Sequence, residues 1–332
     1  MLISCLILVV GLLLLVGGAN VMIRGSTALA TAFQVPPVVI GLTIVAFGTS
    51  APELVVNCTA AFAGQPQLAF GSIIGSCTIN LGWVLAITAL VKAIKVEPSI
   101  ISREIPMMLL ATAVFFVLAS DRFFDHAPEN LLTRGNGAVL LLLFGVFLYY
   151  TISSILRTPK KVQDADPFLE EISESLERQK PLSKTLSLCL TIGGLAALVS
   201  GGRVTVYAAV KIATAIGIPE VIIGLTVISF GTTLPELITG ILATRRGEGD
   251  IAIGNVVGSN IFNLLFVGGT VAAIQPIPVP RGGITDLLFL TVLSALVLPI
   301  CIRGQRTVTR YEGAFLLSLY LSYLAWRILT ST

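Results

Sequence analysis

The amino-acid sequence predicts an all-α polytopic membrane protein with ten transmembrane helices, arranged as two inverted-topology five-helix repeats. The first supporting observation is composition: of 332 residues, 55% are hydrophobic and only 12% are charged, with a mean hydropathy of +0.94. A globular chain typically carries roughly 25% charged residues, so a soluble surface and a disordered chain are both excluded. The second observation is a series of long uncharged stretches, and the third is a pair of motifs that occurs twice.

The uncharged stretches have the length of membrane spans. Stretches such as 1–23, 68–91 and 138–156 approach the roughly 20 residues that cross a bilayer as a helix. A β-barrel would instead alternate apolar and polar residues in segments of about 10. The first stretch lacks a basic leading region and a clear cleavage site, so we interpret it as a retained helix. We expect ten spans, of which the first and sixth extend to about 33 and 216: 2–23, 35–63, 68–91, 100–120, 131–156, 185–202, 218–243, 250–274, 284–302 and 311–330.

A polar linker divides the chain in two. The longest polar stretch, 157–184, separates an N-terminal five-helix repeat at 1–156 from a C-terminal five-helix repeat at 185–332. Phe168, Ile172 and Leu176 recur every four residues within this linker, so a short interfacial helix and a solvated segment both fit the pattern.

The distribution of Lys and Arg predicts the orientation, because cytoplasmic loops carry an excess of both. With the N-terminus outside, the cytoplasmic loops hold 15 of the 21 Lys and Arg residues and the other side holds 6. We therefore expect both termini outside and the linker 157–184 in the cytoplasm. No basic patch is interleaved with aromatic residues, so no nucleic-acid partner is expected. The five scattered cysteines match neither a disulfide framework nor a zinc site.

Two motifs repeat at a constant offset. GLTIVAFGTSAPE at 41–53 and GLTVISFGTTLPE at 224–236 are identical at eight of 13 positions. The same offset relates GSIIGSCTIN at 71–80 to GNVVGSNIFN at 254–263. Each half holds five spans, and this odd number makes the second half enter the membrane from the opposite side. Inverted repeats around a midplane site are typical of secondary transporters.

Glu53 and Glu236 are the acidic residues that lie deep within the expected spans, and they occupy matching repeat positions. A carboxylate at the bilayer centre costs about 2.5–3.5 kcal/mol on insertion scales, so it needs a partner. No Lys or Arg lies at a comparable depth in the same spans, which leaves a shared cation or protons as partners. The proline before each glutamate also frees a carbonyl oxygen four residues earlier, at Gly48 and Gly231.

Hydroxyl and amide oxygens share the helix faces of these glutamates, because residues three and four apart are neighbours on a helix. Such hard oxygen ligands suit Ca²⁺, and Na⁺ accepts them too, whereas no nitrogen or thiolate set suits Zn²⁺ or Cu⁺. For the Ser–Asn pairs of the second motif, polar contacts between helices are an alternative role. The candidate ligands are Thr49, Ser50, Ser76, Asn80, Thr232, Thr233, Ser259 and Asn263.

Charge balance favours antiport. Two ionised carboxylates are neutralised by one Ca²⁺, two Na⁺ or two protons. An empty site leaves two negative charges in a medium of low dielectric constant, and this opposes crossing without cargo.

At these residues the sequence resembles the cation/calcium antiporter superfamily, specifically its prokaryotic Na⁺/Ca²⁺ exchanger branch. GTSAPE and GTTLPE resemble the family's α-repeat signature GTSxPE, and the second motif resembles its G(N/S)xxGSNxxN element. The resemblance implies a core of helices two, three, seven and eight, with helices one and six sliding across it to alternate access. It also implies a plasma (inner) membrane location.

The resemblance further implies roles for individual residues. Glu53 and Glu236 would carry the central Ca²⁺, with Thr49 and Thr232 at the same site. Flanking Na⁺ sites would use the hydroxyls of Ser50, Ser76, Thr233 and Ser259 and the backbone carbonyls of Ala46 and Ser229.

The sequence departs from the family pattern at four positions that matter for the site. Thr233 stands in place of Ser, and Ser229 is the repeat partner of Ala46, which adds a hydroxyl. Cys77 stands where the family usually has Asn, and its repeat partner is Asn260. Asn263 is neutral where some relatives, including K⁺-dependent ones, carry Asp, so K⁺ co-transport is not expected.

The expected function is therefore a Na⁺/Ca²⁺ antiporter that works as a monomer without a cofactor, with Ca²⁺ and Na⁺ as the transported ions. A H⁺/Ca²⁺ antiporter that uses the same glutamates is the alternative. An enzyme is not expected, because an intramembrane protease needs a Ser/His pair or paired Asp residues at membrane depth, and the single histidine, His126, lies in a polar loop. A passive channel is disfavoured by inverted repeats and proline-broken helices.

Overall fold

The computed structural model describes residues 2–33, 37–124, 126, 128–157, 182–216, 230 and 233–331. Within them, eight helices are long and apolar enough to cross a membrane, or nine if a bent pair is one span. These helices coincide with nine of the expected spans. Most of the linker and the first part of the expected span 218–243, including Ser229 and Thr232, lie outside the described residues.

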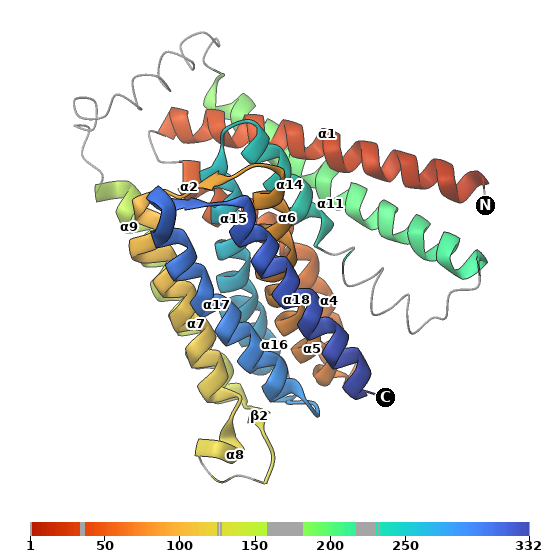
Figure 1. Cartoon of the computed structure of the whole chain (residues 1–332), viewed down its shortest axis with the longest axis vertical. Helices are drawn as coiled ribbons and strands as arrows, with labels where there is room; N and C mark the ends of the chain where they lie inside the picture. The colour runs from red at the N-terminus through yellow and green to blue at the C-terminus, as the bar shows by residue number, and fades with distance from the viewer. Residues whose placement is uncertain are drawn as a thin grey trace.

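Two long antiparallel helices lie side by side across the flank of the bundle, as Figure 1 shows: α1 (Leu2–Phe33) and α11 (Lys184–Ala215). Both helices extend to about the longer limits expected for the first and sixth spans, 33 and 216. Their backbones meet at glycines: a Cβ on Gly18 would lie 2.4 Å from the backbone nitrogen of Leu198, and one on Gly194 would lie 2.3 Å from that of Met22. Small residues of this kind allow the close packing common between membrane helices.

The second expected span is broken, as the proline at its centre predicts. It consists of α2 (Pro37–Ile40), the π-helical segment η1 (Gly41–Val45), α3 (Ala46–Thr49) and α4 (Ala51–Phe62). The segments 41–49 and 51–62 are bent by 46°. The counterpart of α4 in the second repeat is α14 (Leu234–Arg245), which begins one residue before the matching proline just as α4 does.

Two central helices occupy the middle of the bundle, and 78% of the most apolar 18-residue window of each is buried. The first joins α5 (Pro66–Ile79), η2 (Asn80–Val84) and α6 (Leu85–Val91). The second joins α15 (Gly249–Ile261), η6 (Phe262–Val267) and α16 (Gly268–Ile274). In both, a π-helical segment interrupts the helix at the end of the second motif. Such segments are rare and often occur at functional sites.

The remaining helices pack around this core (Figure 1): η3 (Ile100–Glu104) with α7 (Ile105–Leu118), α8 (Asp121–Phe124), α9 (Arg134–Arg157), α17 (Gly283–Arg306) and α18 (Arg310–Ser331). Two short antiparallel strand pairs join their ends: β1 (Ile94–Lys95) with β4 (Thr307–Val308), and β2 (Leu131–Leu132) with β3 (Ile277–Pro278). The expected span 131–156 is therefore wrong at its start, because Leu131 and Leu132 pair with β3 and the helix begins at Arg134.

The repeat extends to the turns. Gly64 and Gly247 occupy matching repeat positions, and both have positive φ, of 75° and 87°. Each ends its helix with the same backbone hydrogen bonds, for example Gln65 N to Ala60 O and Glu248 N to Ala243 O, both 2.9 Å. Glycine is favoured here because L side chains rarely adopt this conformation. Arg246 also ties the second turn to α1, since it donates to the backbone oxygen of Asn20 at 3.1 Å.

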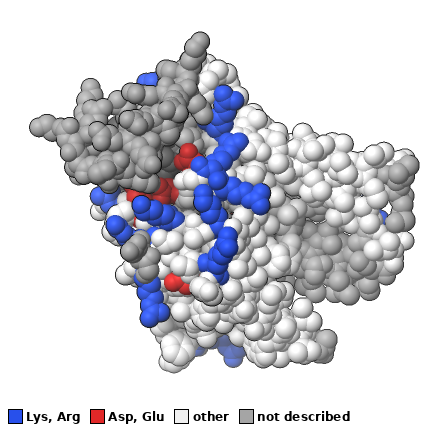
Figure 2. Space-filling view, turned by 45° about the horizontal axis from the view of Figure 1, so that its top comes forward, with Lys and Arg blue, Asp and Glu red and all other residues white. Residues whose placement is uncertain are grey.

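Charge is distributed unevenly over the surface. Figure 2 shows Lys and Arg side chains gathered in a band over the end of the bundle that faces the viewer, while the projecting flank of α1 and α11 is almost uncharged. Many large apolar side chains are exposed on α1, including Ile3, Leu6 and Leu13 at 59–73%. An uncharged apolar flank is what a helix bundle presents to lipid.

Candidate cation site

The two buried glutamates lie in the first turns of two helices that occupy matching repeat positions. Glu53 lies in the first turn of α4 and Glu236 in the first turn of α14, with exposed fractions of 4% and 1%. The two carboxylates lie close enough for their charges to interact. Each stands at the N-terminus of a half-helix, where the helix dipole stabilises negative charge. Within the described residues, neither forms an ion pair with Lys or Arg.

The residue that precedes each of these two helices has nearly the same backbone conformation. Ser50 precedes α4 with φ −89° and ψ 0°, and Thr233 precedes α14 with φ −93° and ψ 1°. Ser and Thr in this position normally cap the helix with their hydroxyl, but neither side chain does so here. Thr233 donates instead to the carbonyl of Phe230 at 3.0 Å, while the Ser50 hydroxyl is left for another partner.

Thr49 joins the two halves of the site. Its hydroxyl lies 3.4 Å from the Ala46 carbonyl and 3.2 Å from Oδ1 of Asn255 on α15. A hydroxyl has one proton to donate and two lone pairs. Donation to Asn255 therefore leaves the lone pairs of Thr49 available to a cation.

The second motif supplies the remaining oxygens from the central helices. Ser76 and Asn80 are exposed by 6% and 1%, and Ser259 and Asn263 by 0% and 2%. Glycine brings the neighbouring segment close: a Cβ on Gly258 would lie 2.7 Å from the carbonyl oxygen of Leu42. The second motif of the C-terminal repeat thus packs directly against the first motif of the N-terminal repeat, whereas a Cβ on Gly71 or Gly75 would meet nothing within 4 Å.

Several of these polar atoms lack a protein partner. A buried polar atom without a hydrogen bond costs about 1–3 kcal/mol, so a group of them indicates a ligand. Buried oxygens with no hydrogen-bond partner among the described residues belong to six expected ligands: Ser50 Oγ, Glu53 Oε2, Asn80 Oδ1, Glu236 Oε2, Ser259 Oγ and Asn263 Oδ1. All six are hard oxygens from the two motifs, which is the donor set that Ca²⁺ and Na⁺ prefer.

Sequence reasoning missed three asparagines that contact this set. Asn57 donates to the Glu53 carbonyl at 2.7 Å, Asn255 accepts from Thr49, and Asn260 accepts from the Asn80 amide at 3.1 Å. Asn255 and Asn260 belong to the second motif itself. The signal that could have identified them was that this motif contains asparagines besides the Ser–Asn pair four residues apart. Of the expected ligands, Ser229 and Thr232 lie outside the described residues.

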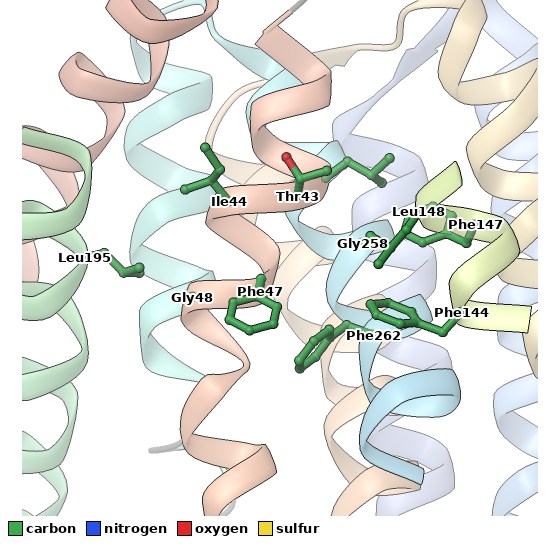
Figure 3. Close-up of a pocket in the computed structure, with 11 residues that line it drawn as sticks. Thr43, Ile44, Phe47, Gly48, Phe144, Phe147, Leu148, Leu195, Gly258 and Phe262 are labelled. Atoms are coloured by element: carbon green, nitrogen blue, oxygen red, sulfur yellow. The ribbon is translucent and has the colours of Figure 1, made fainter. Parts of the chain in front are cut away.

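An apolar pocket of about 330 Å³ lies beside the site, between η1, α3, α9, α11 and α15 (Figure 3). Phe47, Phe144 and Phe262 point into it, and Leu195 closes it from α11. The hydroxyl of Thr43 donates to the Val39 carbonyl at 2.6 Å. The apolar lining of this pocket is unsuited to a bare ion, so the candidate cation site is the oxygen cluster around the glutamates.

The fold and the site together define a helical membrane protein with a buried cluster of oxygen atoms around two glutamates, one from each repeat. Comparison with known proteins agrees. A model of the sodium/calcium exchanger protein family matches residues 3–153 and 186–329. The chain therefore belongs to this family, in the cation/calcium antiporter superfamily.

Full-length relatives support the assignment. The putative antiporter CaxA of Alkalimonas amylolytica is 36% identical over 97% of this chain and 98% of its own. The inner membrane protein YrbG of Escherichia coli K12 is 34% identical over 98% and 97%, respectively. Among solved structures, the sodium-calcium exchanger NCX_Mj, soaked with Na⁺, Ca²⁺ or Sr²⁺ in various combinations, has a TM-score of 0.81 and 29% identity, with 98% of both chains covered. This chain is thus a transporter of the cation/Ca²⁺ antiport type.

Proposed function

We propose that this protein exchanges Na⁺ for Ca²⁺ by alternating access at a midplane site formed around Glu53 and Glu236. The observation that carries the proposal is the set of six buried oxygens that have no hydrogen-bond partner in the described part of the chain, drawn from both repeats and centred on two carboxylates. The similarity to an exchanger studied with Na⁺, Ca²⁺ and Sr²⁺ supports the same cargo.

The chemistry of the site supports coupled exchange. One Ca²⁺ or two Na⁺ neutralise the two carboxylates, and hydroxyl and amide oxygens replace the hydration shell. Without cargo, two negative charges are left at low exposure, and the cost of burying them opposes the empty transition. Glu53, Glu236, Thr49 and Thr232 would form the Ca²⁺ site. The flanking Na⁺ sites would use Ser50, Ser76, Thr233 and Ser259 with the carbonyls of Ala46 and Ser229, and the amide oxygens of Asn80 and Asn263 would complete the oxygen shell around the bound cation.

The proposed mechanism uses the two repeats as inverted halves, 1–156 and 185–332, connected by a cytoplasmic linker at 157–184. The matching backbone conformations of Ser50 and Thr233 and the matching turns at Gly64 and Gly247 support two equivalent halves. The helix pair α1 and α11 would slide across the core to open either side. We place the protein in the plasma (inner) membrane as a monomer, with both termini outside.

Proton-coupled Ca²⁺ transport is the second candidate. The same two glutamates are buried within reach of each other, so each can bind a proton in place of Na⁺. The hydroxyl oxygens of the cluster favour Na⁺, because a proton on a carboxylate needs no additional oxygen ligands.

The test is Ca²⁺ uptake into liposomes that contain the purified protein, driven by an outward Na⁺ gradient. We expect uptake that requires internal Na⁺ and that falls to the level of empty liposomes in Glu53→Gln and in Glu236→Gln, because each variant removes half of the negative charge. Glu129→Gln, which removes a carboxylate from an exposed loop, is the matched control and retains uptake.

The other outcomes separate the candidates. Uptake that ignores Na⁺ but follows an imposed pH gradient would establish the proton-coupled mechanism. Uptake that needs neither gradient and does not saturate would indicate a channel.

A further inference from the structure

The second motif differs between the repeats at one buried position. Cys77 on α5 and Asn260 on α15 are repeat partners, and both are fully buried. They also contact each other. The Asn260 amide donates to the Cys77 carbonyl at 3.2 Å, and the Cys77 sulfur lies 3.9 Å from the Asn260 carbonyl. The two central helices therefore meet at this pair.

Asn260 also holds an expected ligand. Nδ2 of Asn80 donates to Oδ1 of Asn260 at 3.1 Å. An asparagine side chain carries its donor and its acceptor on opposite arms of a planar amide, so fixing the nitrogen directs the oxygen the other way. That oxygen, Asn80 Oδ1, is buried and has no hydrogen-bond partner among the described residues.

We propose that Asn260 is a positioning residue that aims the Asn80 amide oxygen at the transported cation. The proposal rests on the proposed function, since it concerns the same site. Cys77 cannot play the equivalent part for Asn263, because a thiol has a single weakly polar atom and no amide. The two repeats therefore hold their asparagine ligands unequally.

Two successive hydrogen bonds cross the interface between the central helices. Asn80 donates to Asn260, and Asn260 donates to the backbone of Cys77, so the orientation of Asn260 is itself fixed by a carbonyl that no side-chain substitution removes. The amide also lies 3.9 Å from the sulfur of Met108 on α7. A ligand held in this way loses little freedom when the ion binds, which increases affinity.

The alternative role for Asn260 is a structural contact between α5 and α15. Hydrogen bonds between membrane helices contribute about 0.6 kcal/mol on average. A purely structural role would lower the melting temperature and the amount of active transporter, but it would leave the Ca²⁺ concentration for half-maximal transport unchanged.

The experiment is a double-mutant cycle that measures the Ca²⁺ concentration for half-maximal transport. We expect Asn260→Ala to raise it by about 10-fold or more, the usual effect of removing a partner of a metal ligand. We expect Asn80→Ala combined with Asn260→Ala to be no worse than Asn80→Ala alone, because Asn260 acts through Asn80. In the matched cycle, Cys77→Ala leaves the half-maximal concentration unchanged, and its combination with Asn263→Ala is additive.

An unchanged half-maximal concentration in Asn260→Ala would overturn the proposal, and so would additive effects of the Asn80 and Asn260 variants. Coupling between Cys77 and Asn263 would overturn the inequality of the repeats. If Asn260→Ala does not fold, Asn260→Leu keeps the side-chain volume without its polar atoms and takes its place in the cycle.

A second measurement tests the role of Asn260 independently of which ion, Na⁺ or H⁺, drives Ca²⁺ transport. The melting temperature of the detergent-purified protein, titrated with CaCl₂, reports Ca²⁺ affinity whichever ion drives transport. If Ca²⁺ stabilises the wild-type protein but Na⁺ drives no uptake, only the proposal of Na⁺ exchange is contradicted. The role of Asn260 is then judged from the Ca²⁺ titration of Asn260→Ala. If Ca²⁺ neither stabilises the wild-type protein nor is transported by it, both proposals are overturned.

Discussion

At the scale of single residues, the Ser50 hydroxyl is expected to contribute to ion binding and not to the stability of the fold. Replacing a serine at the start of a helix by alanine normally costs about 0.5–2 kcal/mol, because a capping hydrogen bond is lost. Ser50 makes no such bond, and its Oγ is buried without a partner among the described residues. We therefore expect Ser50→Ala to leave the melting temperature in EDTA unchanged but to raise the Na⁺ concentration needed for half-maximal Ca²⁺ exchange.

The control for this variant is Ser294→Ala on α17, which also removes a buried hydroxyl without a described partner but lies outside both motifs. It is expected to leave the Na⁺ dependence unchanged. A loss of stability in Ser50→Ala with normal Na⁺ dependence would show that this hydroxyl supports the helix and does not bind the ion.

The same scale shows what the sequence can predict of the site. Spacing along one helix placed Glu53 with Thr49 and Ser50, because faces of a helix repeat every three to four residues. It could not find that Thr49 meets Asn255 or that Asn80 meets Asn260, since these contacts join residues 206 and 180 positions apart. Such pairings depend on how α15 lies against α3 and η2, and no local pattern contains that information.

At the scale of helices, the close contact between α1 and α11 predicts that adjacent glycines differ in their tolerance of substitution. A Cβ on Gly18 or Gly194 would meet backbone atoms at 2.4 and 2.3 Å, whereas a Cβ on Gly17 or Gly193 would meet nothing within 4 Å. Forcing the helices apart costs about 1–3 kcal/mol, as overpacking does. We expect Gly18→Ala and Gly194→Ala to lower both the melting temperature and the transport rate.

The adjacent variants Gly17→Ala and Gly193→Ala are the controls. They carry the same gain in helix propensity, about 1 kcal/mol, without the collision, so they are expected to be neutral or slightly stabilising. Equal melting temperatures and rates in all four variants would show that the helix pair does not depend on this close contact.

Element boundaries followed from the sequence where a strong local signal exists. Hydropathy predicted the long helices, and Pro52 predicted the break that bends the segments 41–49 and 51–62 by 46°. The π-helical segments at Asn80 and Phe262 had no such signal. Neither did the pairing of Leu131 with Pro278, because a strand of two apolar residues cannot be told from the start of an apolar helix.

At the scale of the whole molecule, the inverted arrangement predicts which side of the membrane each helical turn faces. The turns around Gly64 and Gly247 have the same backbone conformation and the same hydrogen bonds, yet five spans per repeat, as proposed, would place them on opposite sides of the membrane. The uncharged turn after α4 would face outward, and the turn with Arg245 and Arg246 would face the cytoplasm. Both turns carry exposed positions suited to labelling, namely Ala63 and Arg245.

Single cysteines in a cysteine-free background test this arrangement with a membrane-impermeant maleimide on intact cells. We expect Ala63→Cys to react at once and Arg245→Cys to react only after the membrane is permeabilised, because the bilayer separates the second thiol from the reagent. The reverse pattern would invert the assigned orientation but keep the two halves opposed. Reaction of both cysteines from the same side would contradict inverted repeats, and with them the symmetric site around Glu53 and Glu236 on which alternating access depends.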